Sequence, residues 1–585
     1  YAHTLHTVRI VHNAHSVHRS RVQKGQSCDC INFVRATDPA AGSGNFLTET
    51  YISLRRLEND ALYEETHGQM MLGDNDVIQV SIGQFYGIEI NDFAVTVAKT
   101  ALWIAESQMM QETEQLMQIN LDFLPLKSYA NIVEGNALRI DWESVVDKSK
   151  LSYIMGNPPF VGYSLQSKSQ KDDMLSIYVD EKGKPYKTAG KIDYVSAWYF
   201  KAAQLMQGTT VRTAFVSTNS ITQGEQVAGV WKPLYDRFGV HIDFAHRTFR
   251  WDSEASLKAH VHCVIVGFSI AENKADRRLF DNGNGKVVRN INPFLVEAPD
   301  IFVESRNKPL CNVPEMLKGS SPVDGGNLLL SNDEYIELVR IEPDARKCLK
   351  RFLGAREFLH DILRWCLWFD DVSPREINRL PNVKKRIEAV KQFRLSSSKA
   401  TTRKFADYPT RLMELRQPKS NYILIPRHTS ENRRYIPFGF MTPNVICGDA
   451  NNMLPNATLY HFGILTSNVH MAWMRAVAGR LEMRYRYSMD IVYNNFPWCN
   501  PTPEQKARIE QTAQMILDAR AKYPDCSLAD LYDETVMPPE LRKAHQLNDR
   551  AVMEAYGFWG KLNTESECVA ELMKMYQRLT EGEKK

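Results

Sequence analysis

A strand-like apolar run, LSYIMG (151–156), is followed at once by Asn157, Pro158, Pro159 and Phe160. Each proline lacks an N–H and has a fixed φ, so this loop belongs neither to a helix interior nor to a central strand. Asn157 Oδ1 and the Pro158 carbonyl could accept both hydrogens of an exocyclic amine while Phe160 stacks on its ring. Such acceptors would draw the nitrogen toward sp³ geometry and direct its lone pair at an electrophile. The alternative is a β-turn that the prolines merely stiffen.

Residues 38–46, DPAAGSGNF, lie between another strand-like run and a helical pattern. Gly42 and Gly44 allow the chain to turn sharply and a ligand to approach closely, and the next helix directs its first amides there. No GK[ST] follows, so this is not a P-loop. A glycine turn of this kind also serves helix packing in many α/β proteins.

Two further strand ends carry polar groups. Glu89 ends FYGIEI (85–90), where a carboxylate can accept hydrogen bonds from both ribose hydroxyls. Asn136 lies in EGNAL and could hydrogen-bond an adenine edge, with Ala137 offering its backbone N–H. Because the carboxyl ends of parallel strands form the usual ligand crevice, these groups together indicate a nucleoside cofactor. Taken alone, a carboxylate at a strand end is more often structural.

The surrounding sequence predicts the sheet that would position these groups. Amphipathic helical patterns at 47–60 and 92–110 alternate with strand-like runs at 32–37, 85–90, 130–138, 151–156 and 211–219. This alternation predicts a parallel α/β sheet with helices on both faces. Runs at 240–249 and 259–269 predict an antiparallel pair at one edge. Beyond about residue 270, segments such as DNGNGKVVRNINPF are typical of a linker region, and helical patterns return from 502.

Size and composition limit the possible classes of protein. A chain of 585 residues predicts about two to four domains. There is no run of about 18 apolar residues and no signal-peptide pattern, so no membrane partner is expected. The ten cysteines show no repeated CxxC spacing, which predicts reduced thiols and a cytoplasmic location. The net charge of +3 does not by itself predict a nucleic-acid partner.

Charge is nevertheless concentrated in KKRIEAVKQFRLSSSKATTRK (384–404). Such a segment either contacts phosphates or forms a solvated helix face. The candidate phosphate contacts are Lys384, Lys385, Arg386, Arg403 and Lys404.

The first 33 residues contain five of the fifteen histidines and show no clear hydrophobic period. They are expected to form an irregular or non-native leader. His12, His15, Cys28 and Cys30 fit no common zinc spacing, so no metal is expected.

The motif order DPAAGSGNF, GIE, GNA and GNPPF resembles the gamma-type DNA adenine-N6 methyltransferases, which use S-adenosyl-L-methionine. The resemblance implies that Asn157, Pro158 and Phe160, stiffened by Pro159, hold a flipped adenine. Asn136 stands where many relatives have Asp, and Ala41 where many have Cys. The implied cofactor-binding residues are Asp38, Pro39, Ala40, Gly42, Gly44, Asn45 and Phe46 toward the methionine part, Glu89 at the ribose, and Asn136 and Ala137 near the adenine.

The segments DYVSAWYFKAA, STNSITQGEQV and GRLEMRYRYSMDIVYNNFPW resemble the MmeI-type (type IIL) restriction–modification enzymes. In that family a recognition domain follows the methyltransferase, and a pair spaced like Glu482 and Arg484 contacts base edges of double-stranded DNA. Arg can donate to guanine and Glu can accept from cytosine N4. An i, i+2 pair on a strand or extended loop would face one side. The alternative is a surface ion pair.

These observations predict a Rossmann-like α/β methyltransferase domain (34–270) after the leader (1–33). A mixed α+β target-recognition domain (271–500) and a helical C-terminal region (501–585) are expected to follow. The expected protein is a monomer that methylates adenine N6 in a specific duplex sequence, within a restriction–modification or phage-defence system.

Two alternatives stay open: a protein-glutamine N-methyltransferase, and a DNA-binding specificity fragment whose catalysis is impaired. Relatives carry a PD-(D/E)xK nuclease and a cofactor-binding segment upstream. Neither pattern precedes residue 34, so a truncated reading frame or a methylation-only fragment without cleavage activity is expected.

Overall fold

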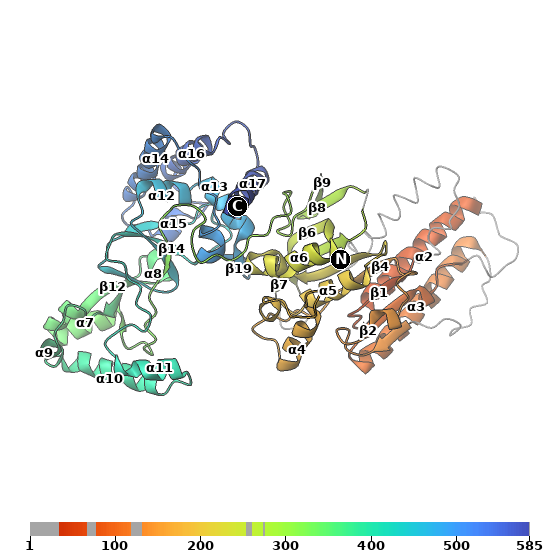
Figure 1. The fold of residues 1–585 in the computed structure, drawn as a ribbon, viewed down its shortest axis with the longest axis horizontal. Coiled ribbons are helices and arrows are strands. Elements are labelled where there is room, and N and C mark those ends of the chain that lie inside the picture. The colour runs from red at the N-terminus through yellow and green to blue at the C-terminus, as the bar shows by residue number, and fades with distance from the viewer. Residues whose placement is uncertain (1–33, 67–77, 119–130, 253–259, 273–274, 584–585) are drawn as a thin grey trace. The chain divides into compact units, whose positions relative to one another are not determined.

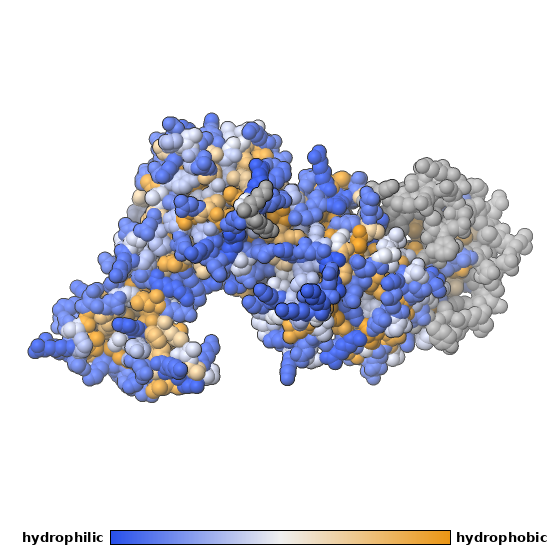
Figure 2. All heavy atoms as spheres, in the orientation of Figure 1, coloured by the Kyte–Doolittle hydropathy of each residue, from blue (hydrophilic) through white to orange (hydrophobic). Residues whose placement is uncertain are grey.

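The computed structural model describes residues 34–66, 78–118, 131–252, 260–272 and 275–583. The chain divides into two compact units, with the change near residue 302. In the described residues, no helix combines the length and apolarity needed to cross a membrane. On the face drawn in Figure 2, hydrophobic residues are interspersed among hydrophilic ones.

The first unit is built on a nine-stranded sheet with the order β3-β2-β1-β4-β5-β7-β6-β8-β9. The five strands from β3 to β5 in that order are parallel, whereas β7 is antiparallel to both β5 and β6. Sequence order reverses between β1 and β4, which is the topological switch point where such sheets bind ligands. The strands are β1 (Ala36–Asp38), β2 (Phe85–Glu89), β3 (Asn131–Glu134), β4 (Tyr153–Gly156), β5 (Arg212–Thr218), β6 (His241–Asp252), β7 (His260–Ser269), β8 (Arg277–Asp281) and β9 (Asn284–Val288).

Helices α2 (Asn45–Thr66) and α3 (Asp92–Met117) lie side by side in the red-to-orange part of Figure 1. Helix α3 begins where the Asn91 side chain accepts a hydrogen bond from the Ala94 N–H. Each helix buries one apolar face, because its apolar residues recur at helical spacing. The core below them contains Leu47, Tyr51 and Leu54 of α2, Val95, Ala98 and Leu102 of α3, and Ala36, Phe85, Ile132 and Met155 from the sheet side.

Three more helices follow in this part of the chain: α4 (Lys168–Ile177), α5 (Ser196–Leu205) and α6 (Gly224–Phe238). Most of α5 is buried, including Trp198, Tyr199 and Phe200. A helix apolar around most of its circumference must be covered on several sides. Helix α5 is therefore an internal support of the unit.

The second unit contains three small sheets, with the orders β10-β18-β14-β16, β11-β13-β12-β17 and β15-β20-β19. Their strands are β10 (Leu317–Lys318), β11 (Leu329–Ser331), β12 (Leu349–Leu353), β13 (Arg364–Leu367), β14 (Tyr422–Pro426), β15 (His428–Thr429), β16 (Gly439–Met441), β17 (Val445–Cys447), β18 (Asn451–Pro455), β19 (Gly479–Leu481) and β20 (Arg484–Arg486). The helices are α7 (Asn332–Ile341), α8 (Ala355–Leu359), α9 (Pro374–Ile377), α10 (Pro381–Leu395), α11 (Ala400–Lys404), α12 (Leu459–Leu465), α13 (Asn468–Val477), α14 (Pro503–Ala521), α15 (Leu528–Leu531), α16 (Pro539–Tyr556) and α17 (Glu565–Glu583).

The sequence predictions of an α/β first part, a mixed α+β middle and a helical end are confirmed. Strands β6 and β7 pair antiparallel as expected, but they are not at the edge, because β8 and β9 extend the sheet beyond β6. The assignment of DNGNGKVV to a linker was therefore wrong. Asn282 and Gly283, with φ of 47° and 85°, form the tight turn between β8 and β9.

One arginine of the basic segment 384–404 is fully buried. Arg394 on α10 is 0% exposed and donates hydrogen bonds to four backbone carbonyls within 3.0 Å, those of Pro322, Val323, Tyr408 and Arg411. The Pro322 and Tyr408 carbonyls also accept the N–H groups of Met413 and Arg411, so the guanidinium adds donors and ties two irregular segments to α10. Arg394 is thus a structural residue.

Replacing Arg394 should therefore destabilise the second unit far more than replacing an exposed neighbour. We expect Arg394→Met to lower its free energy of unfolding by about 3 kcal/mol, since buried carbonyls lose their donors. Lys385→Met, on the exposed side of α10, should change it by less than about 0.5 kcal/mol. Urea denaturation of both variants tests this, and equal midpoints would contradict the structural role of Arg394.

Candidate active site

The predicted site residues of the first unit meet at one edge of the sheet. Asp38 ends β1, Glu89 ends β2, Asn136 follows β3, and Asn157 follows β4. Because these strands are parallel, their carboxyl ends lie together, on both sides of the switch point between β1 and β4. The structure thus brings together the four strand ends that the sequence singled out.

The loop after β1 is folded tightly onto β2. The Ala41 N–H donates to the Ile88 carbonyl (3.0 Å), and the Gly42 N–H donates to Glu89 Oε2 (2.8 Å). Gly42 has φ +52°, and a Cβ there would meet no atom within 4 Å, so this turn is open on its outer side. Gly44 has φ +81° and packs so closely on Ala98 that a side chain would not fit. Gly42 thus leaves space for a ligand, and Gly44 allows the start of α2 to pack closely on α3.

Asp38 is 1% exposed, and its carboxyl group lies directly over Gly156, where an added Cβ would overlap Oδ1. Oδ1 accepts a hydrogen bond from the Ala40 N–H (2.9 Å), whereas Oδ2 has no partner in the described part of the chain. Burial raises the pKa of Asp38 to about 7; the Ala40 N–H opposes this shift and the Glu89 carboxylate adds to it. A buried oxygen without a partner at a sheet switch point fits a cationic or N–H-bearing ligand.

The loop after Gly156 presents the predicted amide and ring. Asn157 is exposed, and no hydrogen bond joins its side chain to the described residues. Pro158 is buried, Pro159 is exposed, and half-buried Phe160 packs against the apolar cluster of Val216, Cys263 and Ile265, together with Phe46. The amide is therefore free to bind, while the ring is held from one side.

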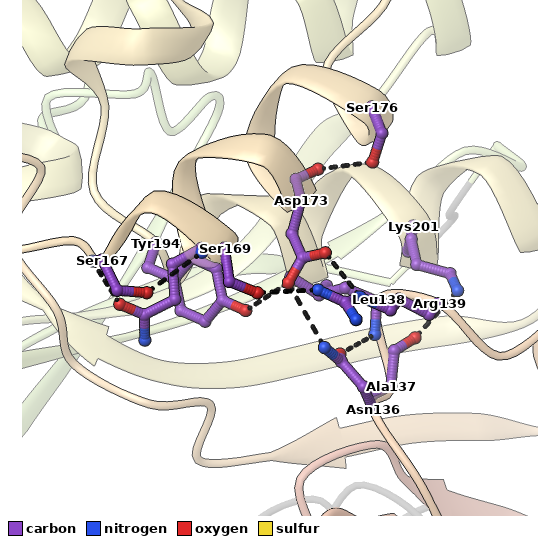
Figure 3. Close-up of polar contacts among 11 residues, drawn as sticks. Asn136, Ala137, Leu138, Arg139, Ser167, Ser169, Asp173, Ser176, Tyr194 and Lys201 are labelled. Atoms are coloured by element: carbon purple, nitrogen blue, oxygen red, sulfur yellow. Dashed lines mark hydrogen bonds and ion pairs between the residues drawn. The ribbon is translucent and has the colours of Figure 1, made fainter.

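The polar groups that follow β3 already have hydrogen-bond partners within the protein, which the sequence did not predict. Asn136 Oδ1 accepts the Leu138 N–H (2.9 Å), and its Nδ2 donates to Asp173 Oδ2 (3.2 Å), as Figure 3 shows. The Ala137 carbonyl accepts hydrogen bonds from Trp142 Nε1 and Lys201 Nζ, both at 2.8 Å. This loop is therefore pinned on both sides of the predicted adenine contact.

Helix α5 and the residues just before it anchor three of these loops. Tyr194 donates its N–H to the Val161 carbonyl (3.0 Å) and its O–H to Asp173 (3.2 Å). Trp198 donates to the Pro39 carbonyl (2.9 Å), and Lys201 reaches the Ala137 carbonyl. Trp198 and Lys201, three residues apart, lie on one face of α5, and Tyr194 lies in the turn just before the helix. Burial lowers the pKa of Lys201 to about 8. Sequence analysis included Tyr194, Trp198 and Lys201 only in the family-like segment DYVSAWYFKAA and gave them no role, and it did not identify Asp173.

The second unit carries the predicted base-reading pair. Leu481 of β19 pairs with Arg484 of β20, which leaves Glu482 in the turn with φ +58°. Glu482 is thus in a hairpin turn and not in an extended segment, yet its Oε2 accepts a hydrogen bond from Arg484 (2.8 Å). Both side chains are at least half exposed, at 69% and 50%. The pair forms a two-residue patch with one acceptor and one donor group.

The predicted phosphate contacts do not share one environment. Arg386 is half-buried, pairs with Glu334 (2.5 Å) and donates to the Asn327 carbonyl, so it is engaged within the unit. The others are exposed on α10 and α11: Lys384, Lys385, Arg403 and Lys404. The described residues contain no group of three or more His, Cys, Asp or Glu that could hold a metal ion. His12, His15, Cys28 and Cys30 lie outside the described residues.

Comparison with known proteins gives matches along nearly the whole chain. Models of the MmeI DNA-methyltransferase domain, target recognition domain and C-terminal domain match residues 18–281, 297–500 and 501–582. DNA methyltransferase A of Bacillus subtilis is 38% identical over 556 residues, which are 94% of this chain and 62% of that protein. The chain thus spans less than two thirds of the length of this curated relative.

A solved structure gives a similar result. The type IIL restriction–modification enzyme MmeI, determined in complex with DNA, shares 43% sequence identity with a TM-score of 0.85. The match covers 94% of this chain and 74% of that one. By these matches, the chain belongs to the MmeI family.

Proposed function

We propose that this chain is a site-specific DNA methyltransferase that transfers a methyl group from S-adenosyl-L-methionine to adenine N6, within a restriction–modification or phage-defence system. The observation that carries the proposal is the contact of Asp38 with Gly156. It joins the loop that would hold the cofactor to the loop that would hold the target amine. Membership of the MmeI family supports the DNA target.

The residues at the switch point fit this cofactor. The unpartnered Asp38 Oδ2 can accept from an ammonium group, and the open side of Gly42 leaves room for an aliphatic chain. Glu89 and the Asn136 loop lie on the neighbouring strands, where ribose and adenine would follow. When bound, S-adenosyl-L-methionine supplies an electrophilic methyl group. Asp38, Pro39, Ala40, Gly42, Gly44, Asn45, Phe46, Glu89, Asn136 and Ala137 are the proposed cofactor-binding residues.

The residues after β4 would prepare the amine. An adenine amino group is a poor nucleophile because its lone pair is delocalised into the ring. Two acceptors, Asn157 Oδ1 and the Pro158 carbonyl, would draw that lone pair out of conjugation, and the prolines fix the carbonyl in advance. Phe160 would stack on the flipped base. The amide is exposed and unpaired within the described chain, as this role requires.

The second unit would select and hold the DNA. Arg484 can donate to guanine and Glu482 can accept from cytosine N4 in the major groove. Lys384, Lys385, Arg403 and Lys404 would add sequence-independent affinity that falls with salt; Arg386 would contribute less because it is already paired with Glu334. We propose that the first unit, up to about residue 302, is catalytic, that the second unit up to residue 500 recognises the target, and that 501–585 supports it.

The first test removes one acceptor of the proposed amine clamp, which is the segment of residues 157–160 after β4. Asn157→Ala should lower methyl transfer to target DNA by about 100-fold or more, because one of two acceptors is lost in the transition state. DNA and cofactor affinities should stay within about twofold, since Asn157 makes no other contact that would be lost. Radiolabelled methyl transfer and equilibrium binding measure both. Asn307→Ala, at an exposed position of the second unit, is the control, and activity of Asn157→Ala above a tenth of wild type would contradict the role.

The second test exchanges the charges of the base-reading pair. The double substitution Glu482→Arg and Arg484→Glu should move the methylated sequence to a different base pair at one position, because donor and acceptor change places. The control exchanges the exposed pair Lys308 and Glu315 of the same unit in the same way and should leave the sequence unaltered. Sequencing for methylated bases reads out both, and an unchanged target in the first variant would refute the assignment.

The third test concerns pH. Asp38 titrates near 7, so below that pH it is neutral and cannot pair with an ammonium group, and above it the carboxylate is available. Affinity for S-adenosyl-L-methionine should therefore rise with pH up to about 7, by as much as about tenfold per pH unit. Asp38→Asn should bind S-adenosyl-L-methionine more weakly and should lack this rise of affinity with pH. Any pH dependence that remains in this variant then comes from titration of the ligand. Identical pH profiles for the two proteins would contradict the assigned ion pair.

A further inference from the structure

Asp173 on α4 is a buried carboxylate that accepts hydrogen bonds from three residues in two segments, the loop after β3 and the turn before α5. Its side chain is 7% exposed. Oδ1 accepts from Arg139 Nε (2.8 Å), and Oδ2 accepts from both Tyr194 Oη and Asn136 Nδ2, each at 3.2 Å. Figure 3 shows the carboxylate between these groups. Arg139 Nη2 also donates to the Ser169 hydroxyl (2.8 Å), which lies on α4 together with Asp173. The charge is thus well satisfied, and one of its donors belongs to the cofactor loop.

This arrangement determines which way the Asn136 amide points. The Leu138 N–H can only donate, so it requires Oδ1, and the Asp173 carboxylate can only accept, so it requires Nδ2. Turning the amide over would set Nδ2 against an N–H and Oδ1 against a carboxylate oxygen. One N–H hydrogen of Nδ2 and one lone pair of Oδ1 remain for a ligand.

The remaining groups match one kind of purine. A 6-aminopurine presents a donor at N6 beside an acceptor at N1, which suits an amide offering one lone pair and one N–H. A 6-oxopurine presents the reverse, an acceptor at O6 beside a donor at N1. A freely turning asparagine could serve either base, whereas a fixed one prefers the first. Selectivity at this position therefore depends on what fixes the amide.

We propose that Asp173 is a positioning residue that holds the Asn136 amide in the orientation selective for the adenine of the cofactor. The inference rests on the proposed function, since it takes Asn136 to face a nucleoside base. Tyr194 and Arg139 keep the carboxylate in place. Burial, followed by the Asp173 charge, raises the pKa of Tyr194, so its hydroxyl stays a donor.

The test compares two ligands that differ only at the purine edge, S-adenosylhomocysteine and its 6-oxo analogue S-inosylhomocysteine. Calorimetry on the full chain gives the dissociation constant of each and their ratio. Wild type should prefer the adenine form by about tenfold or more. In Asp173→Asn, Arg139 retains Oδ1 and the new NH₂ faces Asn136 Nδ2. We expect adenine affinity to fall about tenfold and the ratio to approach one. Asp172→Asn, an equal charge change at the exposed adjacent position, should leave both values within about twofold.

A reciprocal exchange separates positioning from general damage to the fold. Asn136→Asp alone places two carboxylates at hydrogen-bond distance and should weaken binding. Combined with Asp173→Asn, it restores an acid–amide pair that can hold the loop, but the carboxylate at position 136 has no N–H for purine N1. The double variant should therefore melt within a few degrees of wild type while its adenine preference stays near one. Recovery of the adenine preference in the double variant, or an unchanged ratio in Asp173→Asn, would overturn this inference alone. Failure of wild type to bind S-adenosylhomocysteine would instead overturn the cofactor assignment and this inference with it.

Discussion

The buried carboxyl group of Asp38, lying on Gly156, is the contact on which the rest of the site depends. Only glycine leaves room for Asp38 at the end of β4, and only at the reversal of strand order do the ends of β1 and β4 lie next to each other. The cost of burying Asp38 appears as a pKa raised to about 7. A ligand ammonium group would offset that cost. The contact thus couples the proposed cofactor loop to the amine clamp through two adjacent strands.

The loops around the site are held in place by α5 and the turn just before it. Tyr194 bonds to the loop after β4 and to Asp173, Trp198 bonds to the loop after β1, and Lys201 bonds to the loop after β3. All three loops follow parallel strands. Anchoring them to one buried segment limits their movement, which is what a preorganised site needs. The exposed Asn157 side chain can then be the free group in an otherwise fixed frame.

The sequence predicted the parallel sheet and the four strand-end motifs because glycines, prolines and apolar runs act locally. It also predicted the three-part architecture, which the comparisons with the MmeI family support. It did not predict that β8 and β9 continue the sheet, since β9 is largely exposed and lacks apolar alternation. Nor could it identify Asp173 or Arg394, whose partners lie between 11 and 72 residues away. A buried charge has no local signature, because its role is set by donors and acceptors that only the fold brings near.

The proposed activity is methylation of adenine N6 at one DNA sequence by the loop after β4, the cofactor loops and the recognition unit acting together. Single-molecule sequencing of DNA from a methylation-deficient host expressing this chain tests it most directly. N6-methyladenine is expected at nearly every copy of one defined sequence, and none is expected in a host expressing Asn157→Ala. Absence of N6-methyladenine with a stably expressed, folded chain, or methylation scattered without a common sequence, would contradict it.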